Sequence, residues 1–595
     1  MMQRESIVVR FEGSAGDGIL SIGTIIAKTA ARCGFHACTL SSFLAEVRGG
    51  QSSFQLKLSR REVSSPGDAP EVVIALNRVA VVNQARALDN DGTLLHPPDA
   101  DVAEIEATKL PVDYDAICTL ATGATRSKNL VAAGVLSRLL GLDPAVATAV
   151  VRQSFGKKSS EVIEAAARAF EAGASFAESH FGECTKLQLK PAMAPPRILI
   201  SGNEAVALGA IVAGVRFFAG YPITPASEVM EMLAKHLPRI GGRALQAEDE
   251  IASLGMCIGA AFGGQKTLTA TSGPGLSLMT ELLGLASMAE LPIVIVDVQR
   301  AGPSTGMPTK DGQADLNLAV YGAHGDSPRV VLAPQSVSDC FNDTIRAINI
   351  AHEFHIPVVL LSSQSISHRM QTVALPSLDD VRVYEEPLFQ GSLNGAEPFR
   401  RYEPAANGTA SIRSIPGTPG GMYRTGGLEH DATGQPGFDE GLRVANVARR
   451  RERLVAVNRA FENDPQCDQA VLGSHAVAVL SWGSSAGAAR EAVDSLRAQG
   501  FDIGFLFPRV VWPLPTTAIE QLLASGIETL YVCEVNDTQQ FAQMLRASFA
   551  VQLRTHGVEV VGVTQDNGSP FSAREVQQRL QQLLGEQTSR IRQAV

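Results

Sequence analysis

Closely spaced cysteine pairs are missing from this chain. It has eight cysteines in 595 residues, and no two of them are spaced as CxxC. Iron–sulfur clusters and structural zinc sites use such pairs, so we expect no metal centre in this chain. Cys33 and Cys38 bracket GFHA and could pair, whereas Cys118, Cys257 and Cys533 lie in apolar or small-residue stretches typical of buried thiols. Free buried thiols favour a reducing cytoplasm. The other cysteines are Cys184, Cys340 and Cys467.

Features of membrane and nucleic-acid binding are also scarce. No apolar run reaches the roughly 18 residues of a membrane-spanning helix, and MMQRES precedes a strand pattern without the regions of a signal peptide. Charged residues make up 19% of the chain and the net charge is −10, which argues against a nucleic-acid surface. We therefore expect a cytoplasmic globular protein, and its length and apolar content are enough for about three or four domains.

Apolar strand patterns alternate with helical patterns through most of the chain, which predicts an α/β fold with parallel, doubly wound sheets. A linker, PAMAPP, begins at Pro191. We predict four parts: residues 1–190, with strands near Ile7, Phe54, Val72 and Ala116; a doubly wound domain over 197–372; an irregular crossover and charged helix over 373–465; and an α/β domain over 466–595.

The crossover is rich in Gly and Pro and has little periodicity. It could be a disordered linker or an ordered segment that lies against a partner chain. The basic run ARRRERL in the helix that follows, residues 439–462, is most simply a solvated helix face.

The most informative motif is GYPITP, from Gly220 to Pro225. It separates an apolar run from an amphipathic pattern, which predicts a strand-to-helix turn at the mouth of a parallel sheet, where ligands bind. Pro222 and Pro225 fix two φ angles, so the Thr224 hydroxyl is held rigidly between them. Thr224 could orient a small polar substrate or simply cap the following helix.

Carboxylates begin the next helical pattern, in the segment QAEDE that ends at Glu250. Acidic residues at a helix start can serve only the helix dipole. A desolvated carboxylate could instead hold a proton and share it with a ligand nitrogen, which thiamine chemistry requires beside its aminopyrimidine ring. Glu248 and Glu250 are both candidates. TSGPG, residues 271–275, supplies a turn whose glycines allow close backbone contact.

Arg300 directly follows the apolar run LPIVIVDV, so we expect a permanent cation at the carboxyl end of a buried strand. It could grip a carboxylate bidentately or serve as a structural ion-pair partner. Lys310 lies in the Gly-, Pro-, Ser- and Thr-rich loop that follows. It could meet a second carboxylate of a substrate or be merely solvated.

Together the motifs resemble the α subunits of 2-oxoacid:ferredoxin oxidoreductases that have a γ domain fused at the N-terminus, with 2-oxoglutarate:ferredoxin oxidoreductases as the most similar group. The resemblance covers nearly all of the chain. It implies a γ-type domain, a pyrimidine-binding domain for thiamine diphosphate and a transketolase C-terminal-like domain. The motifs that carry it are GSAGDG at Gly13, EVRGGQSS at Glu46, GYPITP at Gly220, EDEIASLG at Glu248, TSGPGLSLM at Thr271, VQRAGPSTGMPTKDGQADL at Val298, GLEHD at Gly427 and SWGSSAG at Ser481.

The activity implied by this resemblance is oxidative decarboxylation of 2-oxoglutarate with coenzyme A to succinyl-CoA, CO2 and reduced ferredoxin, or the reverse carboxylation. Pyruvate and branched-chain or aryl 2-oxoacids are alternative substrates. A non-catalytic scaffold subunit is the alternative of another class, and a simple transketolase or decarboxylase would normally have its own complete diphosphate motif.

The resemblance also implies roles for single residues. The catalytic residues would be Glu250, Arg300 and Thr224, with Thr224 and Arg300 on the 2-oxoacid and Lys310 as a further substrate contact. Glu250 is preferred over Glu248 as the carboxylate on the aminopyrimidine, because its spacing to the TSGPGLSLM motif matches the family better. The residues implied to bind the cofactor are Tyr221, Pro222, Ile223, Glu250, Ser272 and Gly273.

The diphosphate half of a thiamine site is incomplete, because such a site needs GDG followed by Asn, and the first asparagine after the GDG at Gly16–Gly18 is Asn77. This GDG is better explained as an anion-binding turn or a simple tight turn. In related γ domains the region is associated with coenzyme A, and the candidate contacts are Gly13, Ser14, Gly16, Asp17, Gly18 and Arg48. We therefore expect the diphosphate, Mg²⁺ and a [4Fe-4S] cluster to be bound by an obligate β subunit, in an (αβ)₂ heterotetramer that reduces ferredoxin.

Overall fold

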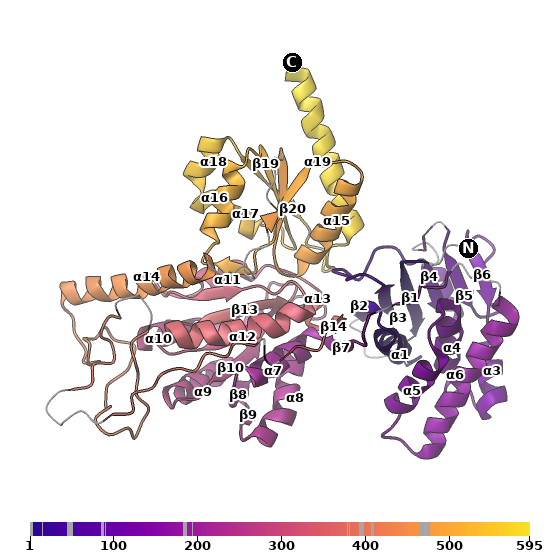
Figure 1. Ribbon diagram of the computed structural model, residues 1–595, viewed down its shortest axis with the longest axis horizontal. Helices are drawn as coiled ribbons and strands as arrows, with labels where there is room; N and C mark the ends of the chain where they lie inside the picture. The colour runs from indigo at the N-terminus through magenta and orange to yellow at the C-terminus, as the bar shows by residue number, and fades with distance from the viewer. Residues whose placement is uncertain are drawn as a thin grey trace. The chain divides into compact units, whose positions relative to one another are not determined.

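The computed structural model divides the chain into two compact units, Met1–Ser201 with His368–Ser377 and Gly202–Ser367 with Leu378–Val595 (Figure 1). Within the part of the chain that the structure describes, no helix is both long enough and apolar enough to cross a bilayer. The described residues are 4–14, 16–43, 51–84, 88–89, 91–182, 187–192, 194–377, 379, 381–391, 398–405, 410–462, 470–471 and 476–594.

The first unit contains an eight-stranded sheet in the order β6-β5-β4-β1-β3-β2-β14-β7. The strands β1, β4, β5 and β6 run parallel, whereas β3, β2, β14 and β7 pair antiparallel, so this sheet is mixed. The strands are β1 (Ser6–Ser14), β2 (His36–Phe43), β3 (Gln51–Ser59), β4 (Val72–Ala75), β5 (Thr93–His96), β6 (Thr108–Pro111), β7 (Ile198–Ser201) and β14 (Met370–Val373).

Helices of the first unit pack on the apolar residues of this sheet, with Ile7, Val9 and Phe11 of β1 fully buried. The predicted strand near Ala116 is wrong, because Ala116 lies in helix α3. The Asp113 side chain caps that helix by accepting a hydrogen bond from the Ala116 amide at 2.9 Å, and a short apolar run alone does not distinguish the two structures. The helices are α1 (Ile19–Arg32), α2 (Arg78–Gln84), α3 (Tyr114–Thr122), α4 (Lys128–Leu140), α5 (Pro144–Ser154) and α6 (Ser160–Phe181).

The second unit contains a seven-stranded sheet in the order β18-β12-β13-β11-β10-β8-β9, in which only β18 is antiparallel to its neighbour. From β8 the chain continues to β9 on one side, and from β10 to β11 on the other. The strand order therefore reverses between β8 and β10. The strands are β8 (Phe217–Gly220), β9 (Arg243–Gln246), β10 (Thr267–Thr271), β11 (Val294–Gln299), β12 (Val330–Leu332), β13 (Val358–Ser363) and β18 (Val510–Trp512).

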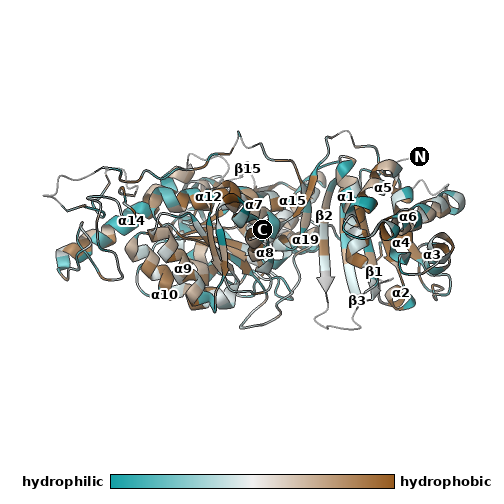
Figure 2. Cartoon of the chain, turned by 90° about the horizontal axis from the view of Figure 1, so that it is seen from below, coloured by the Kyte–Doolittle hydropathy of each residue, from teal (hydrophilic) through white to brown (hydrophobic). Residues whose placement is uncertain are grey.

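Helices cover both faces of this sheet, as predicted for a doubly wound domain: Figure 2 shows α7 and α12 on one face and α9 and α10 on the other. The core beneath α9 and α10 includes Ile295, Leu276 and Met279, all fully buried. The helices are α7 (Gly202–Val212), α8 (Ser227–His236), η3 (Leu237–Ile240), α9 (Glu250–Phe262), α10 (Gly273–Ala289), α11 (Leu316–Tyr321), α12 (Val337–Phe354) and α13 (Gln364–Ser367).

A five-stranded sheet, in the order β15-β17-β16-β19-β20, forms the C-terminal part of the same unit and is parallel except at β15. Buried Gln313 joins the two sheets, because its side chain donates to the Trp482 carbonyl and accepts from the Val535 amide, each at 2.9 Å. The elements are β15 (Ala470–Val471), β16 (Val477–Ser481), η5 (Gly483–Ser485), α15 (Ala486–Ala498), β17 (Ile503–Leu506), α16 (Thr516–Ala524), β19 (Thr529–Glu534), α17 (Gln540–Ser548), α18 (Ala550–His556), β20 (Glu559–Thr564) and α19 (Ala573–Ala594).

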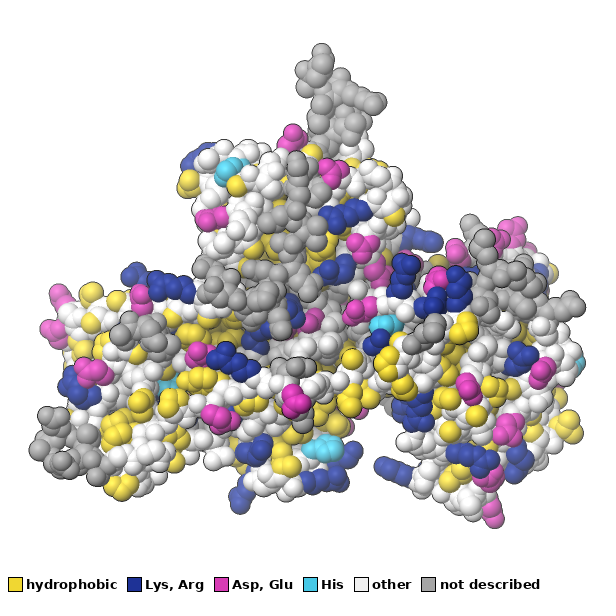
Figure 3. All heavy atoms as spheres, viewed as in Figure 1, with side chains coloured by type: hydrophobic (Ala, Val, Ile, Leu, Met, Phe, Trp, Pro, Cys, Tyr) yellow, Lys and Arg dark blue, Asp and Glu magenta, His cyan; other side chains and the backbone are white. Residues whose placement is uncertain are grey.

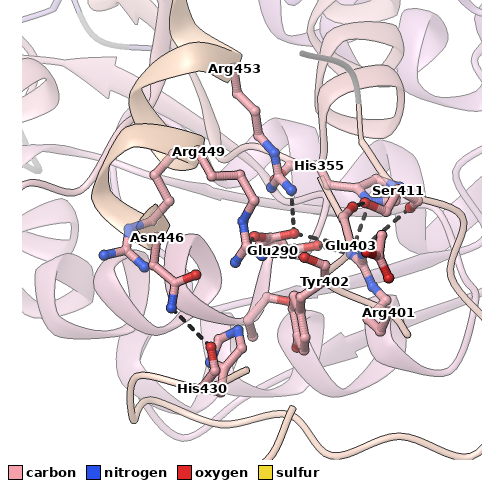
Figure 4. Close-up of polar contacts among 12 residues, drawn as sticks. Glu290, His355, Arg401, Tyr402, Glu403, Ser411, His430, Asn446, Arg449 and Arg453 are labelled. Atoms are coloured by element: carbon pink, nitrogen blue, oxygen red, sulfur yellow. Dashed lines mark hydrogen bonds and ion pairs between the residues drawn. The ribbon is translucent and has the colours of Figure 1, made fainter. Parts of the chain in front are cut away.

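The described part of the crossover is held by its own chain (Figure 4). Fully buried Glu290, at the end of α10, pairs with Arg453 and, at 2.9 Å, with Arg449. Arg401 of the crossover donates to the Glu290 carbonyl at 2.9 Å. Burial alone would raise the pKa of Glu290, but Arg453, Arg449 and Arg401 lower it to about 2. The contacts favour an ordered crossover over a disordered linker, and they lie within this chain.

The basic run of helix α14 (Glu440–Glu462) is only partly solvated, with Arg451 exposed. Arg450 and Arg453 are each only 4% exposed. Arg450 pairs at 2.8 Å with Glu429 of the GLEHD motif, which also accepts a hydrogen bond from Asn446. The interpretation as a solvated face is wrong for these two arginines, because their acidic partners are distant in sequence and become neighbours only in the folded chain.

Candidate functional site

The predicted site residues of the second unit follow four neighbouring strands of its seven-stranded sheet. Thr224 follows β8, Glu250 follows β9, Ser272 follows β10 and Arg300 follows β11. Because these strands are parallel, their carboxyl ends meet at one edge of the sheet, and the strand order reverses there between β8 and β10. Open α/β sheets bind their ligands at such switch points.

Arg300 and Thr224 are in direct contact. The Arg300 Nη1 donates a hydrogen bond to the Thr224 carbonyl at 2.6 Å, and the arginine is only 8% exposed. Burial lowers the pKa of Arg300, and Asp315 opposes that effect. The alternative that Thr224 caps a helix does not hold, since the N-cap of α8 is Ala226 and no side chain caps it.

The two candidate carboxylates differ in burial. Glu248 is exposed, whereas Glu250 is only 7% exposed and begins α9. Between them, Asp249 caps the helix by accepting a hydrogen bond from the Ala252 amide at 2.7 Å. A Cβ atom on Gly275 would lie 2.6 Å from the Glu250 Cγ, so this glycine leaves the space that the Glu250 side chain fills. These contacts favour Glu250 as the desolvated carboxylate.

Ser272 and Gly273 form the start of α10. Ser272 is fully buried, and its hydroxyl has no hydrogen-bond partner among the described residues. A Cβ atom on Gly273 would lie 2.6 and 2.7 Å from the two carboxylate oxygens of Asp315. A glycine at position 273 is therefore explained by the Asp315 carboxylate, which occupies the space that a side chain would fill. Tyr221 and Pro222 are exposed at the same edge, and Ile223 is half-buried.

Lys310 lies on the loop that folds back after Arg300. Its carbonyl accepts a hydrogen bond from the Ala301 amide at 3.0 Å, and its side chain is half-buried. The neighbouring Asp311 amide donates to the Gly568 carbonyl at 3.1 Å, so the C-terminal part of the unit supports this loop. Lys310 thus belongs to the same unit as Arg300.

Two acids near Arg300 were not predicted from the sequence. Asp297 lies within β11 and is fully buried, and Asp315, which is half-buried, lies at the start of α11. Burial raises the pKa of Asp315 to about 6, and it raises that of Asp297 well above the usual range. The signal in the sequence was an acidic residue inside the apolar run IVIVDV.

Three family descriptions match successive parts of the chain. Residues 208–447 match "Pyruvate flavodoxin/ferredoxin oxidoreductase, thiamine diP-bdg", residues 8–176 match "Pyruvate ferredoxin/flavodoxin oxidoreductase", and residues 476–576 match "Pyruvate:ferredoxin oxidoreductase core domain II". The 2-oxoglutarate oxidoreductase subunit KorA of Mycobacterium tuberculosis is 34% identical over 96% of this chain and 90% of its own length. The chain belongs to the 2-oxoacid:ferredoxin oxidoreductase α subunits.

Other members of this family agree. The 2-oxoglutarate synthase subunit KorA of Methanothermobacter marburgensis is 38% identical over 59% of this chain and 90% of its own length. A solved structure of 2-oxoglutarate:ferredoxin oxidoreductase from Magnetococcus marinus, with 2-oxoglutarate, coenzyme A and succinyl-CoA bound, is 34% identical. It covers 98% of this chain and 100% of its own chain, with a TM-score of 0.90. The family resemblance and the α/β fold class are confirmed.

The glycine-rich turn of this α subunit lies between β1 and α1 in the first unit. Asp17 accepts a hydrogen bond from the Ser14 amide at 2.8 Å and another from the Asn77 side chain at 2.9 Å. Asn77 also donates to the Ser14 hydroxyl at 3.1 Å. Gly16 is exposed, and Gly18 has a φ of 73° and ends the turn. Arg48 lies outside the described residues.

The described cysteines of this α subunit, including Cys33 and Cys38, are all free thiols, while Cys184 and Cys467 lie outside the described residues. In the described part of the chain, no three His, Cys, Asp or Glu side chains are grouped as a metal site. On the face drawn in Figure 3, acidic and basic side chains are interspersed.

Proposed function

We propose that this α subunit catalyses the CoA-dependent oxidative decarboxylation of 2-oxoglutarate, or the reverse carboxylation, together with a β subunit. The observation that carries the proposal is Arg300, which is 8% exposed at the switch point, bonded to Thr224, and has no ion-pair partner among the described residues. A guanidinium in this state can bind the carboxylate of a 2-oxoacid through two parallel hydrogen bonds. Thr224 would help to orient the same substrate.

The residues around Glu250 fit the aminopyrimidine end of thiamine diphosphate. Glu250 supplies a nearly buried carboxylate, and Ser272 a buried hydroxyl without a hydrogen-bond partner in the described part of the chain. When bound, thiamine diphosphate supplies the nucleophilic carbon and the electron sink that decarboxylation requires. Glu250 would hold a proton at the aminopyrimidine. The other residues proposed to surround the cofactor are Tyr221, Pro222, Ile223, Ser272 and Gly273.

Lys310 is the proposed contact for the second carboxylate of 2-oxoglutarate. It follows Arg300 on a loop that is bonded back to Ala301, and it is half-buried. Pyruvate has no second carboxylate, so this residue would distinguish the two substrates. Branched-chain and aryl 2-oxoacids are the remaining alternatives.

The turn after β1 is the proposed contact for coenzyme A, through Gly13, Ser14, Gly16, Asp17 and Gly18, with Arg48 as a further candidate. Because the Asp17 carboxylate accepts from the Ser14 amide, a phosphate group would have to use the amides of Gly16 and Gly18 instead. The similar protein from Magnetococcus marinus has coenzyme A bound.

The remaining parts of the reaction are assigned to other chains. We propose that a β subunit supplies the diphosphate site, Mg²⁺ and a [4Fe-4S] cluster, that ferredoxin accepts the electrons, and that the assembly is (αβ)₂. A cytoplasmic location also stays a prediction.

The test is co-expression of this chain with its β subunit, anaerobic purification, and CoA-dependent reduction of ferredoxin or viologen with 2-oxoglutarate and with pyruvate. We expect Arg300→Ala to lower kcat/KM by about 100-fold, because it removes a charge-assisted contact of roughly 3 kcal/mol. Arg300→Lys should recover part of this loss, since it restores the charge but not the planar fork.

Lys310→Ala should raise KM for 2-oxoglutarate and leave KM for pyruvate unchanged. A complex that contains thiamine diphosphate and an intact cluster, but oxidises no 2-oxoacid, would contradict the proposed enzymatic activity. It would favour a non-catalytic scaffold subunit. An Arg300→Ala complex that assembles and keeps full activity would contradict the proposed site alone.

A further inference from the structure

Two carboxyl groups near Arg300, one buried and one half-buried, have oxygens without a hydrogen-bond partner among the described residues. Asp297 is fully buried in β11, and neither of its carboxylate oxygens has a hydrogen-bond partner among the described residues. Asp315 is also without a described partner for its Oδ2. Burying an ionised carboxyl without donors is costly. Unpaired carboxyl oxygens near Arg300, the proposed ligand of the substrate carboxylate, suggest a role at that site.

The described contacts of Asp315 and its helix with neighbouring elements are made by neutral residues. Helix α10 presents Gly273, whose Cα leaves room for the Asp315 carboxylate. On β11, the Gln299 side chain accepts a hydrogen bond from the Asp315 amide at 3.2 Å. From α17, the Gln540 side chain accepts from the Asn317 amide at 2.9 Å.

Among the described residues, one charged group shifts the pKa of each acid of this pair. The charge of Arg300 lowers the pKa of Asp315, and the charge of Asp315 raises the pKa of Asp297. The next acid at this sheet edge is Glu250, which lies against Gly275 rather than Gly273. Burial raises the pKa of Asp315 to about 6 while Arg300 lowers it, and burial together with Asp315 raises that of Asp297 further. Burial and the neighbouring Asp315 thus favour the neutral form of Asp297, and Asp315 is the acid whose charge acts on Arg300.

We propose that Asp315 is a positioning residue that couples carboxylate binding at Arg300 to the uptake of one proton, with Asp297 as its neutral partner. This inference rests on the proposed role of Arg300 as the ligand of the substrate carboxylate. An arriving carboxylate adds a second negative charge beside one buried cation, where charges are poorly screened. Protonation of Asp315 removes that excess negative charge near Arg300.

Carboxylate affinity should then depend on pH in one direction. Binding weakens as the pH rises above about 6, because a larger fraction of the protein must take up a proton in order to bind. The dissociation constant then rises by at most about tenfold per pH unit. The Asp315→Asn variant has no carboxylate at this position to take up a proton. Its affinity for a carboxylate ligand should be independent of pH between 6 and 8, and at pH 8 it should be higher than that of the wild type.

The experiment titrates glutarate into the αβ complex with thiamine diphosphate, because glutarate has the carboxylates but no 2-oxo group to react. Calorimetry at pH 6.5 and 7.5, in two buffers of different ionisation enthalpy, gives both the affinity and the protons taken up. We expect proton uptake on glutarate binding in the wild type and none in Asp315→Asn. Asp326→Asn, which removes an exposed carboxylate of the same unit, should take up as many protons as the wild type.

Uptake in Asp315→Asn equal to that of the wild type would overturn the inference. If that variant does not assemble, the wild type alone still decides, because a pH-independent affinity without proton uptake also overturns it. Failure of the wild type to bind glutarate at all would overturn the proposed role of Arg300 as well, so the two failures are distinguishable.

Discussion

Two glycine-rich turns in this chain follow the same local pattern, a buried strand that leads into a helix. The turn from β1 to α1 is bonded within the first unit, because Asp17 accepts hydrogen bonds from both the Ser14 amide and the Asn77 side chain. The turn from β10 to α10 in the second unit differs. The Ser272 hydroxyl and the nearby Arg300 Nε lack partners among the described residues.

The difference shows what distinguishes a binding site from a tight turn. Buried polar groups in folded proteins are nearly always hydrogen-bonded, so unpaired ones point to a ligand or a function. The edge of the second sheet gathers such groups, whereas the first turn satisfies its own. One residue next to the first turn breaks this pattern: Glu12 is almost fully buried, and its Oε1 has no described partner.

The largest effect is expected at the edge of the second sheet. Glu250→Gln should lower the CoA-dependent activity of the αβ complex by at least about 100-fold, because the amide cannot exchange a proton with the cofactor. Glu248→Gln is the matched control: it removes an exposed carboxylate two positions away and should change activity less than about twofold. Equal losses in both variants would remove the distinction between the buried and the exposed carboxylate.

A second prediction concerns Glu12. Burial raises its pKa to about 7, against the hydrogen bond from Ser53 and the charge of Arg10. The folded chain therefore binds more protons than the unfolded chain between about pH 4.5 and 7, and stability falls as the pH rises through that window. At pH 8, Glu12→Gln should stabilise the first unit by up to about 3 kcal/mol.

Hydrogen exchange of amides in β1, compared between this variant and the full-length wild type at the same pH, measures that gain. The two proteins should become similar below about pH 4.5, where both side chains are neutral. A variant that is less protected than the wild type at pH 8 would show that Glu12 has an ionised role that the described contacts do not reveal.

The smallest effect is expected at the first turn itself. Asp17→Ala leaves the Ser14 amide and the Asn77 side chain without an acceptor in a half-buried place, and it should cost about 1 to 2 kcal/mol. Exchange of amides at the start of α1 reports the loss. The KM for coenzyme A separates the two explanations of the turn: an unchanged value favours a tight turn only, and a changed value favours the anion site.

Local sequence patterns predicted much of the second unit. Prolines on both sides of Thr224, acids before a helix at Glu250 and an arginine after an apolar run at Arg300 each mark the end of a strand, and parallel strands end at one edge of a sheet. These features depend on residues that are close in sequence. The division into four domains and the roles assigned to single residues stay predictions.

Other features depended on partners far away in the chain. Asp297 and Asp315 were not predicted, since nothing local shows that both lie near one arginine. Arg450 and Arg453 of α14 were predicted to be solvated, because Glu429 and Glu290 neutralise them only after folding.

The sequence by itself therefore determined the α/β class, the family and the strand ends where the site residues lie, because periodicity and turn chemistry act over a few residues. The tertiary structure decided which carboxylate is buried, which turn is internally bonded and which charges meet. Those outcomes depend on desolvation and on contacts between residues distant in sequence, and both arise only when the chain is folded.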